Sequence, residues 1–288
     1  MARVQPSHLA GTWYPGDAGQ LREDIDTWLQ AAAPSSRGER LGAVVVPHAG
    51  YRYSGRAAAA AYARVIHTTY TRALIIAPSH HATFRGMAVL DVDAFRTPLG
   101  EVAVDRAAVA ALVRTPLCVD APAAYRDEHS LEIQLPFLQR VLPGVGIVPV
   151  LVGALDADEY AVAATALAGV ADHGSLVVVS SDFVHYGRRF GYLPFDATAP
   201  APVAAALRAL DMGAIGRVCA GDAAGFLAYV ESTGATICGR VPIAVFLTLH
   251  RQRSRGVLLR YYTSLDVTGD YEHSVSYASI GFPEAREP

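Results

Sequence analysis

The feature that most constrains the fold is an alternation, along the whole chain, of short β-branched runs with longer, alanine-rich amphipathic stretches. Runs of this length are typical of buried strands, and the stretches between them have helical periodicity. Such an alternation is typical of a sheet that is at least partly parallel and carries helices on both faces. The sequence therefore predicts an α/β fold with a central mixed, partly parallel sheet flanked by helices.

The expected strands and helices follow from this periodicity. We expect strands at residues 42–46, 73–77, 87–92, 147–152, 176–180, 257–263 and 275–281. We expect helices at residues 18–31, 54–66, 105–113, 129–141, 156–171, 200–210, 221–231 and 240–250. Residues 95–100 contain Pro98 and Gly100, which favour a turn in an antiparallel excursion. The most linker-like stretch is only residues 33–40, so residues 1–288 are predicted to form one domain.

Charge and composition exclude several classes of protein. The 288 residues carry 24 basic and 27 acidic side chains, a formal net charge of −3, which gives no footprint for nucleic acid or an anionic membrane. Every basic residue is arginine, so chemistry that needs a lysine amine is excluded. No apolar run approaches the roughly 18 to 20 residues that span a bilayer, so we expect a cytoplasmic protein with no membrane partner. From the charge balance we expect no nucleic-acid partner either.

Histidines come within two to five residues of the ends of three expected strands. His48 follows the strand at 42–46, His80 and His81 follow the strand at 73–77, and His185 follows the strand at 176–180. In open α/β sheets, ligands bind beyond the carboxyl ends of the strands, where these imidazoles converge if the strands are parallel neighbours. Only one of His80 and His81 is expected to point inward. Converging neutral imidazoles are typical of a transition-metal site.

A further ligand is best supplied by Cys238, which lies just before an apolar helix that has Pro242 in its first turn. The positive end of the helix dipole and the adjacent Arg240 favour the thiolate, which is the form that binds a metal or attacks a substrate. The remaining two cysteines, Cys118 and Cys219, have no histidine or arginine cluster beside them and are expected to be core thiols.

Two further polar groups have alternative interpretations. The segment that begins at Asp127 is either a capped helix start or a source of pocket residues, in which Glu128, His129 or Glu132 orient the ligand imidazoles. Asp182, three residues before His185, is expected to fix the tautomer of an imidazole, to serve as a general base, or only to cap the following turn.

Seven motifs in this order resemble the Memo (mediator of cell motility) family, which is found in bacteria, archaea and animals. They are G-T-W-Y-P at 11–15, P-H-A-G-Y-x-Y-S-G at 47–55, P-S-H-H at 78–81, T-P-L-G at 97–100, E-H-S-L-E-x-Q-L-P-F-L at 128–138, S-S-D-F-x-H-Y-G at 180–187 and C-G-R-x-P-I at 238–243. The resemblance extends over nearly the whole chain.

The resemblance implies a fold like that of the class III extradiol dioxygenases, the LigB-like architecture, with a metal pocket at one end of the sheet. It implies that His48 and His80 are metal ligands and that Cys238 takes the place of the dioxygenases' carboxylate ligand. His185 is similar to their acid/base histidine, or is an additional ligand, with Asp182 as its neighbour. The expected cofactor is a divalent or redox-active transition metal, iron first, with copper and zinc as alternatives.

The leading functional hypothesis is a metal-binding, redox or oxygenase-type protein with an open coordination position and a small-molecule or peptide ligand in its pocket. One alternative is a metal-free cysteine hydrolase with Cys238 as nucleophile and His185 as base. The other is a non-enzymatic binding protein in which aromatic side chains line the pocket mouth. Those side chains are Trp13, Tyr14, Tyr51 and Tyr53. The resemblance also implies a radical S-adenosylmethionine protein as a partner.

Overall fold

A nine-stranded mixed sheet forms the centre of the computed structural model, which describes residues 2–34, 39–66, 68–196, 199–251 and 253–284. Its strands are β2 (Leu41–Val46), β3 (Arg72–Pro78), β4 (Met87–Val89), β7 (Cys118–Asp120), β8 (Gly146–Val152), β9 (Ser175–Ser180), β10 (His185–Gly187), β11 (Val257–Thr263) and β12 (His273–Pro283). They lie in the order β10-β12-β2-β9-β3-β8-β4-β7, and β11 pairs with β12.

The four central strands, β2, β9, β3 and β8, are parallel, and the outer pairs β12–β2 and β4–β8 are antiparallel. The central strands consist almost wholly of buried valine, isoleucine, leucine and alanine. A parallel sheet needs such continuous apolar runs because helices cover both of its faces. The predicted mixed, partly parallel sheet is therefore confirmed.

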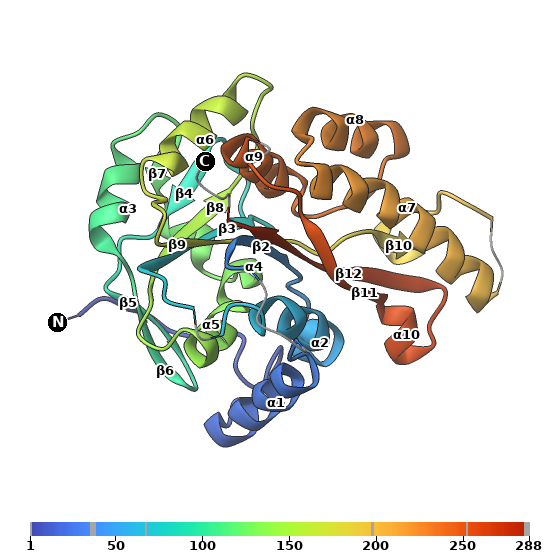
Figure 1. The fold of residues 1–288 in the computed structure, drawn as a ribbon, viewed down its shortest axis with the longest axis horizontal. Coiled ribbons are helices and arrows are strands. Elements are labelled where there is room, and N and C mark those ends of the chain that lie inside the picture. Colours follow the sequence, from blue (N-terminus) through green and yellow to red (C-terminus); the bar gives the residue numbers. More distant parts are fainter. Residues whose placement is uncertain (1, 35–38, 67, 197–198, 252, 285–288) are drawn as a thin grey trace.

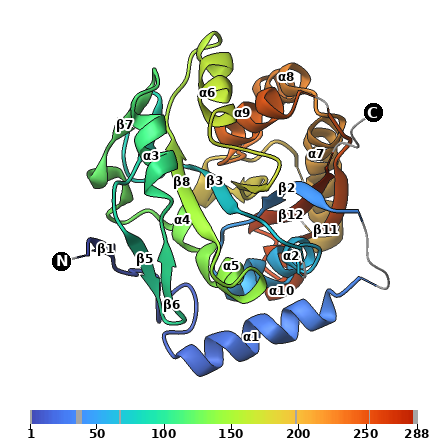
Figure 2. The ribbon, with the colours of Figure 1, turned by 60° about the vertical axis from the view of Figure 1, so that its left-hand side comes forward.

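Helices cover the sheet on both sides. They are α1 (Ala18–Ala31), α2 (Tyr51–Tyr62), α3 (Arg106–Val113), α4 (His129–Glu132), α5 (Leu135–Val141), α6 (Glu159–Ala168), α7 (Pro200–Ala220), α8 (Ala223–Thr233), α9 (Arg240–His250) and α10 (Ser264–Thr268). Figures 1 and 2 show α6, α7, α8 and α9 on one side of the sheet and α1, α2 and α10 on the other. No helix of the described residues is long and apolar enough to cross a membrane.

The predicted boundaries differ from the structure in several places. The helix expected at 129–141 is divided into α4 and α5, because Pro136 lies in the first turn of α5 and has no N–H to continue a helix. The helix expected at 200–210 continues to Ala220 in α7. The strand expected at 87–92 ends at Val89.

The antiparallel excursion at residues 95–100 is confirmed. β5 (Ala94–Thr97) and β6 (Gly100–Ala103) form a hairpin, and β1 (Val4–Gln5) pairs in parallel with β5 to complete a small second sheet. The sequence patterns did not predict the short strands β1, β7 and β10 or the short helix α10.

The sheet order determines where the strand-end histidines lie. β2 and β3 both pair with β9, so their carboxyl ends are separated by two strand spacings, about 10 Å. His48 and His80 each follow the last residue of their strand by two positions. Side chains at these positions can meet above the end of β9, which brings them to one edge of the sheet.

Candidate metal centre

Three imidazoles converge at the carboxyl ends of the central strands. One ligand atom from each of His48, His80 and His129 lies within 4.8 Å of the others, a spacing that suits a shared metal ion. The ring centroid of His48 lies 5.2 Å from that of His80 and 5.3 Å from that of His129. The three rings line a cavity of about 570 Å³, together with Asp182 and His185. Two of the three sequence-predicted histidines therefore meet, and a third imidazole comes from the start of α4.

The tautomer of His48 follows from its hydrogen bonds. Its Nδ1 lies 3.0 Å from the Ser180 hydroxyl, which donates its only proton to the Ser130 carbonyl and also accepts a hydrogen bond from the Gln134 amide. Because the Ser180 proton already bonds to the Ser130 carbonyl, Nδ1 of His48 carries a proton and donates it to the Ser180 oxygen. The lone pair is then on Nε2, and His48 itself is only 2% exposed. Ligand histidines are commonly oriented by such a hydrogen bond from the other ring nitrogen.

Glu128 orients His80 in the same way. One carboxylate oxygen accepts from the His80 backbone N–H at 2.5 Å, and the other accepts from Nδ1–H at 2.9 Å and from the Ser130 N–H at 3.0 Å. Burial acts to raise the pKa of Glu128, but the hydrogen bonds from His80 and Ser130 outweigh it and lower the pKa to about 2. Glu128 is therefore a carboxylate that keeps Nε2 of His80 free to face the cavity.

His129 completes the group through stacking. Its ring centroid lies 4.4 Å from that of His80 and 4.4 Å from that of Trp13, with interplanar angles of 28° and 29°. Burial, and then the neighbouring His80, lowers the pKa of His129 to about 3, and burial likewise lowers the pKa of His48 well below its ordinary value. Both imidazoles are thus neutral near pH 7 and keep the lone pair that a metal needs.

Cys238 lies beside His48, at the start of the loop turn that leads into α9. Its Sγ is 3.1 Å from Nε2 of His48 and 3.5 Å from the Asp182 carbonyl oxygen. Burial raises the pKa of the Cys238 thiol, and the nearby Asp182 adds to the shift. The predicted preference for thiolate is therefore wrong for the metal-free site, because desolvation outweighs the helix dipole and Arg240. Cys238 therefore keeps its thiol proton, and the sulfur faces two acceptors, the Nε2 lone pair of His48 and the Asp182 carbonyl oxygen.

The glycine after Cys238 allows this close approach. A Cβ on Gly239 would lie 2.4 Å from the Cβ of Ser181 and 3.0 Å from the Ser180 carbonyl oxygen. The Gly239 N–H also donates to the Ser181 hydroxyl. The loop that carries Cys238 therefore rests directly on the end of β9.

We expect Gly239→Ala to lower the free energy of unfolding by about 2 kcal/mol, because the added methyl must displace the loop or the end of β9. The control is Gly216→Ala on α7, whose added Cβ would meet nothing within 4 Å. Urea unfolding of both variants measures the effect. Equal stability of Gly239→Ala and the wild type would show that there is room for a methyl group between the loop and the end of β9.

His185 and Asp182 also face the cavity, but they do not bond to each other in the expected way. Nδ1–H of His185 donates to the carbonyl oxygens of Phe183 and Thr236, which leaves Nε2 free. Asp182 accepts a hydrogen bond from the backbone N–H of His48 at 2.8 Å. The tautomer of His185 is therefore fixed by two carbonyls, and the Asp182 carboxylate fixes the backbone of His48.

The other predicted residues divide between pocket and core. Trp13 and Tyr53 line the cavity, whereas Tyr14 and Tyr51 are buried and do not line it, so only half of the proposed aromatic mouth is correct. His80 and His81 are both exposed to some degree, but only His80 lines the cavity and joins the imidazole group, as expected for a pair of which one member points inward. Cys118 is buried as predicted and Cys219 is part-buried against the core.

Residues 127–132 combine both of the interpretations that the sequence allowed. They begin a helix, but the cap is Glu128 and not Asp127. The same Glu128 orients His80, and His129 joins the imidazole group directly, a role for which the sequence offered only indirect support. No spacing rule reveals it, because His129 reaches the site from a helix start and not from a strand end. The histidine within the motif at 128–138 was the one available signal.

The fold and the site together define an α/β protein with a histidine-lined pocket at the carboxyl ends of a parallel strand core. The family model described as Memo-like protein matches residues 5–281. The chain belongs to the Memo family.

Relatives from animals support this assignment over nearly the full length. Protein MEMO1 of Xenopus tropicalis is 35% identical over 287 residues, covering 96% of this chain and 95% of the relative. Protein MEMO1 of Homo sapiens is 33% identical with the same coverage of 96% and 95%. Protein memo-1 homolog of Caenorhabditis elegans is 34% identical over 94% of this chain and 80% of its own.

Among solved structures, an uncharacterized protein from Escherichia coli K12 has a similar fold. The TM-score is 0.54 at 14% sequence identity, with 84% of this chain and 100% of that chain covered. At this identity the likeness concerns the fold alone.

Proposed function

We propose that this Memo-family chain is a metal-binding protein of redox or oxygenase type, with His48 and His80 among its ligands. The observation that carries the proposal is the group of three imidazoles with ligand atoms within 4.8 Å of one another, in the wall of a cavity of about 570 Å³. Neutral imidazoles suit iron, copper and zinc, so the donor set fits the expected cofactor, with iron first. The proposal also keeps the suggested kinship with the LigB-like dioxygenases and a single domain over residues 1–288.

The third ligand is either His129 or Cys238. A ligand atom of His129 lies within 4.8 Å of ligand atoms of both His48 and His80. The Cys238 Sγ atom contacts one of these two residues, at Nε2 of His48. A metal bound to Nε2 of His48 would take the place of the Cys238 thiol proton and favour the thiolate. Small side-chain shifts would bring either residue to a metal held by His48 and His80. Two ligand sets are therefore proposed, one with His129 and one with Cys238, and an experiment distinguishes them.

A bound metal would supply Lewis acidity or electron transfer at an open coordination position. Around it, this chain's own residues hold and orient a ligand. His185 presents a free Nε2 to the cavity, the placement needed for the proposed acid/base role, and Asp182 holds the His48 backbone. Trp13 and Tyr53 give the cavity an aromatic wall against which a small molecule or a peptide side chain can pack.

Metal content tests the proposal. Protein purified without a tag and loaded with iron(II), copper or zinc is expected to bind one equivalent. We expect His48→Ala and His80→Ala to lose it, because each removes a nitrogen ligand. His81→Ala is the matched control, since His81 is the next residue but neither lines the cavity nor belongs to the three converging imidazoles, and it is expected to leave the metal content unchanged. Equal metal content in all four proteins would refute the proposal.

Cobalt(II) distinguishes the two ligand sets. If Cys238 binds the metal, the cobalt form is expected to have an intense near-ultraviolet sulfur-to-metal band that Cys238→Ser abolishes. If His129 is the third ligand, that band is absent and His129→Ala lowers the affinity instead. In either case His48 and His80 remain common ligands.

The cysteine-hydrolase alternative has less support. The Sγ atom of Cys238 contacts His48, and burial keeps its thiol protonated, so the pair with His185 is not the activated one that a nucleophile needs. The role of a binding protein for a peptide or for a radical S-adenosylmethionine partner stays a second proposal, on the aromatic wall of the cavity. Binding of such a partner in the presence of a chelator is its test.

A further inference from the structure

A buried carboxylate behind the site gathers hydrogen bonds from the beginning of the chain. Glu132 accepts from the Ser7 hydroxyl at 2.6 Å, the Tyr14 hydroxyl at 2.6 Å and the Leu9 N–H at 3.2 Å through one oxygen. Its other oxygen accepts from the His8 N–H at 3.2 Å and lies 2.8 Å from His8 Nδ1. The Glu132 side chain is only 4% exposed, so it faces this segment and not solvent.

The segment that Glu132 holds, residues 7–14, is called the N-terminal strap here. It contains a tight turn in which Gly11, at a φ of 83°, donates to the Tyr14 carbonyl oxygen. At its far end the Trp13 carbonyl oxygen accepts from the Tyr51 N–H at 2.8 Å, at the beginning of α2. The strap is thus fastened at two points, one on α4 through Glu132 and one on α2.

Between these two points the strap carries Trp13 to the metal centre. The Trp13 ring stacks on His129 at 4.4 Å with an interplanar angle of 29°, and His129 stacks on His80 at 4.4 Å with 28°. Among the described residues, no hydrogen bond fixes the His129 ring, whose nearest acidic contact is Glu128 at 3.6 Å. The ring plane of His129 is therefore held mainly by the rings on its two faces.

We infer that Glu132 is a positioning residue for the metal centre, because it fastens the N-terminal strap and thereby keeps Trp13 stacked on His129. The inference rests on the proposed function for its consequence in metal binding. Glu132 and His129 lie three residues apart in α4, so one short helix carries both the strap's anchor and the imidazole that the strap covers. Glu132 itself does not line the cavity.

Only a carboxylate suits this position. Four hydrogen-bond donors converge on its two oxygens, and the His8 ring lies within ion-pair distance of one of them. The interactions with His8, Ser7 and Tyr14 outweigh burial and hold the pKa of Glu132 below its ordinary value. An amide offers one acceptor oxygen and two N–H donors, which would face donors already in place. Glutamine at this position would therefore release part of the strap while preserving volume.

The strap is tested first without metal. The chain has two tryptophans, so Trp28→Phe leaves Trp13 as the only indole. In that background we expect Glu132→Gln to increase acrylamide quenching of Trp13 and to shift its emission to the red. Tyr14→Phe, which removes one donor, should give a smaller change in the same direction. Glu101→Gln, at an exposed site on β6, is the matched control and should change nothing.

The second measurement is the dissociation constant of the metal. We expect Glu132→Gln to raise it about tenfold, as loss of an outer partner of a ligand does. In a Trp13→Ala background the same substitution should have no further effect, because Trp13 transmits it. Trp13→Phe should restore much of the affinity that Trp13→Ala loses, since a phenyl ring can still stack.

The outcomes separate the two hypotheses. Unchanged Trp13 emission and quenching in Glu132→Gln would overturn the inference, and so would effects of Glu132→Gln and Trp13→Ala that multiply independently. If the wild type binds no metal, the proposed function fails, and the fluorescence measurement alone decides on the strap.

Discussion

Replacing Glu128 with glutamine is expected to weaken metal binding by about 10- to 100-fold while the fold persists. Glu128 receives the Nδ1–H of His80 and so keeps the lone pair on Nε2. A glutamine amide nitrogen facing Nδ1 would donate instead of accept, which favours the tautomer with the proton on Nε2. That tautomer directs a proton at the metal position.

The measurement is a titration with zinc or cobalt(II) against a competing chelator. Urea unfolding of the wild type and of Glu128→Gln checks that the two proteins are equally stable. Glu101→Gln, which changes an exposed carboxylate paired with Arg96 on the β5–β6 hairpin, is the control and should bind metal as the wild type does. An unchanged dissociation constant for Glu128→Gln would mean that His80 is not a ligand or is not oriented by Glu128.

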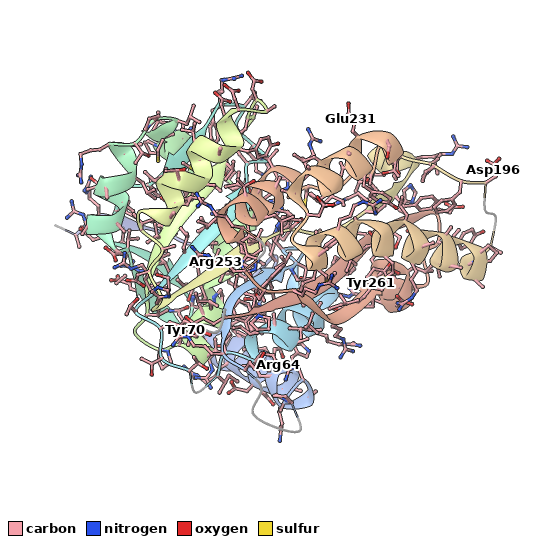
Figure 3. The ribbon with its side chains drawn as sticks, turned by 45° about the horizontal axis from the view of Figure 1, so that its top comes forward. Arg64, Tyr70, Asp196, Glu231, Arg253 and Tyr261 are labelled. Atoms are coloured by element: carbon pink, nitrogen blue, oxygen red, sulfur yellow. The ribbon has the colours of Figure 1, made fainter. Side chains whose placement is uncertain are left out.

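The second large effect is a pH dependence of stability that originates at Asp211 on α7. This buried carboxyl accepts from the Val184 N–H at 3.1 Å and from the Tyr261 hydroxyl at 2.8 Å. Figure 3 shows Tyr261 on the strand that lies alongside α7. Burial raises the pKa of Asp211 from 3.8 to about 6, although these hydrogen bonds act in the opposite direction.

The sign follows from proton binding. Between about pH 4 and pH 6 the folded state keeps a proton on Asp211 that the unfolded state has lost, so stability falls as the pH rises. The stabilisation is fully present below the unfolded pKa and is lost as the pH passes the folded one. The difference in pKa corresponds to about 3 kcal/mol at about 1.4 kcal/mol per unit. Asp211→Asn cannot ionise and is expected to lose this dependence.

Urea unfolding of the wild type and of Asp211→Asn, at several pH values from about 4 to 7, measures the difference. All other titrating groups are common to both proteins, so their contributions cancel in the comparison. The asparagine keeps an acceptor for the Val184 N–H, which supports the backbone directly before His185. Parallel pH profiles for the two proteins would show that Asp211 does not titrate in this range.

Three histidines of the site are oriented in the same way. In His48, His80 and His185 the Nδ1–H donates to an oxygen of the surrounding scaffold, and Nε2 is left toward the cavity or toward Cys238. Three separate elements provide these acceptors, so the same tautomer has been fixed three times by different means. Such preorganisation lowers the cost of binding a metal, because the rings need not reorient.

The fold class could be predicted because it depends on local periodicity. The strand expected at 257–263 coincides with β11 at both ends, and the helices expected at 18–31 and 240–250 coincide with α1 and α9. Burial on both faces requires continuous apolar runs, and amphipathic helices require a repeat of 3.6 residues, so both signals are present in the sequence itself. Short elements such as β10 and α10 escaped prediction because few residues carry any period.

The candidate site was only partly predictable. The positions of His48 and His80 directly after buried runs placed them at the carboxyl edge of the sheet. The predicted thiolate of Cys238 failed because the dipole argument considers only the helix that follows, whereas desolvation depends on everything packed around the sulfur. His129 was proposed only as an orienting partner, since its helix start has no fixed spacing to the strands.

The sequence by itself determined the layers of this protein, the ends of its central strands and the identity of two converging imidazoles, because hydrophobic periodicity and strand polarity are local properties of the chain. Only the tertiary structure decided that β9 lies between β2 and β3, that α4 brings His129 to the same point, and that Glu132 holds the N-terminal strap. Those contacts join residues far apart along the chain, and their formation depends on the packing of the whole core rather than on any nearby pattern.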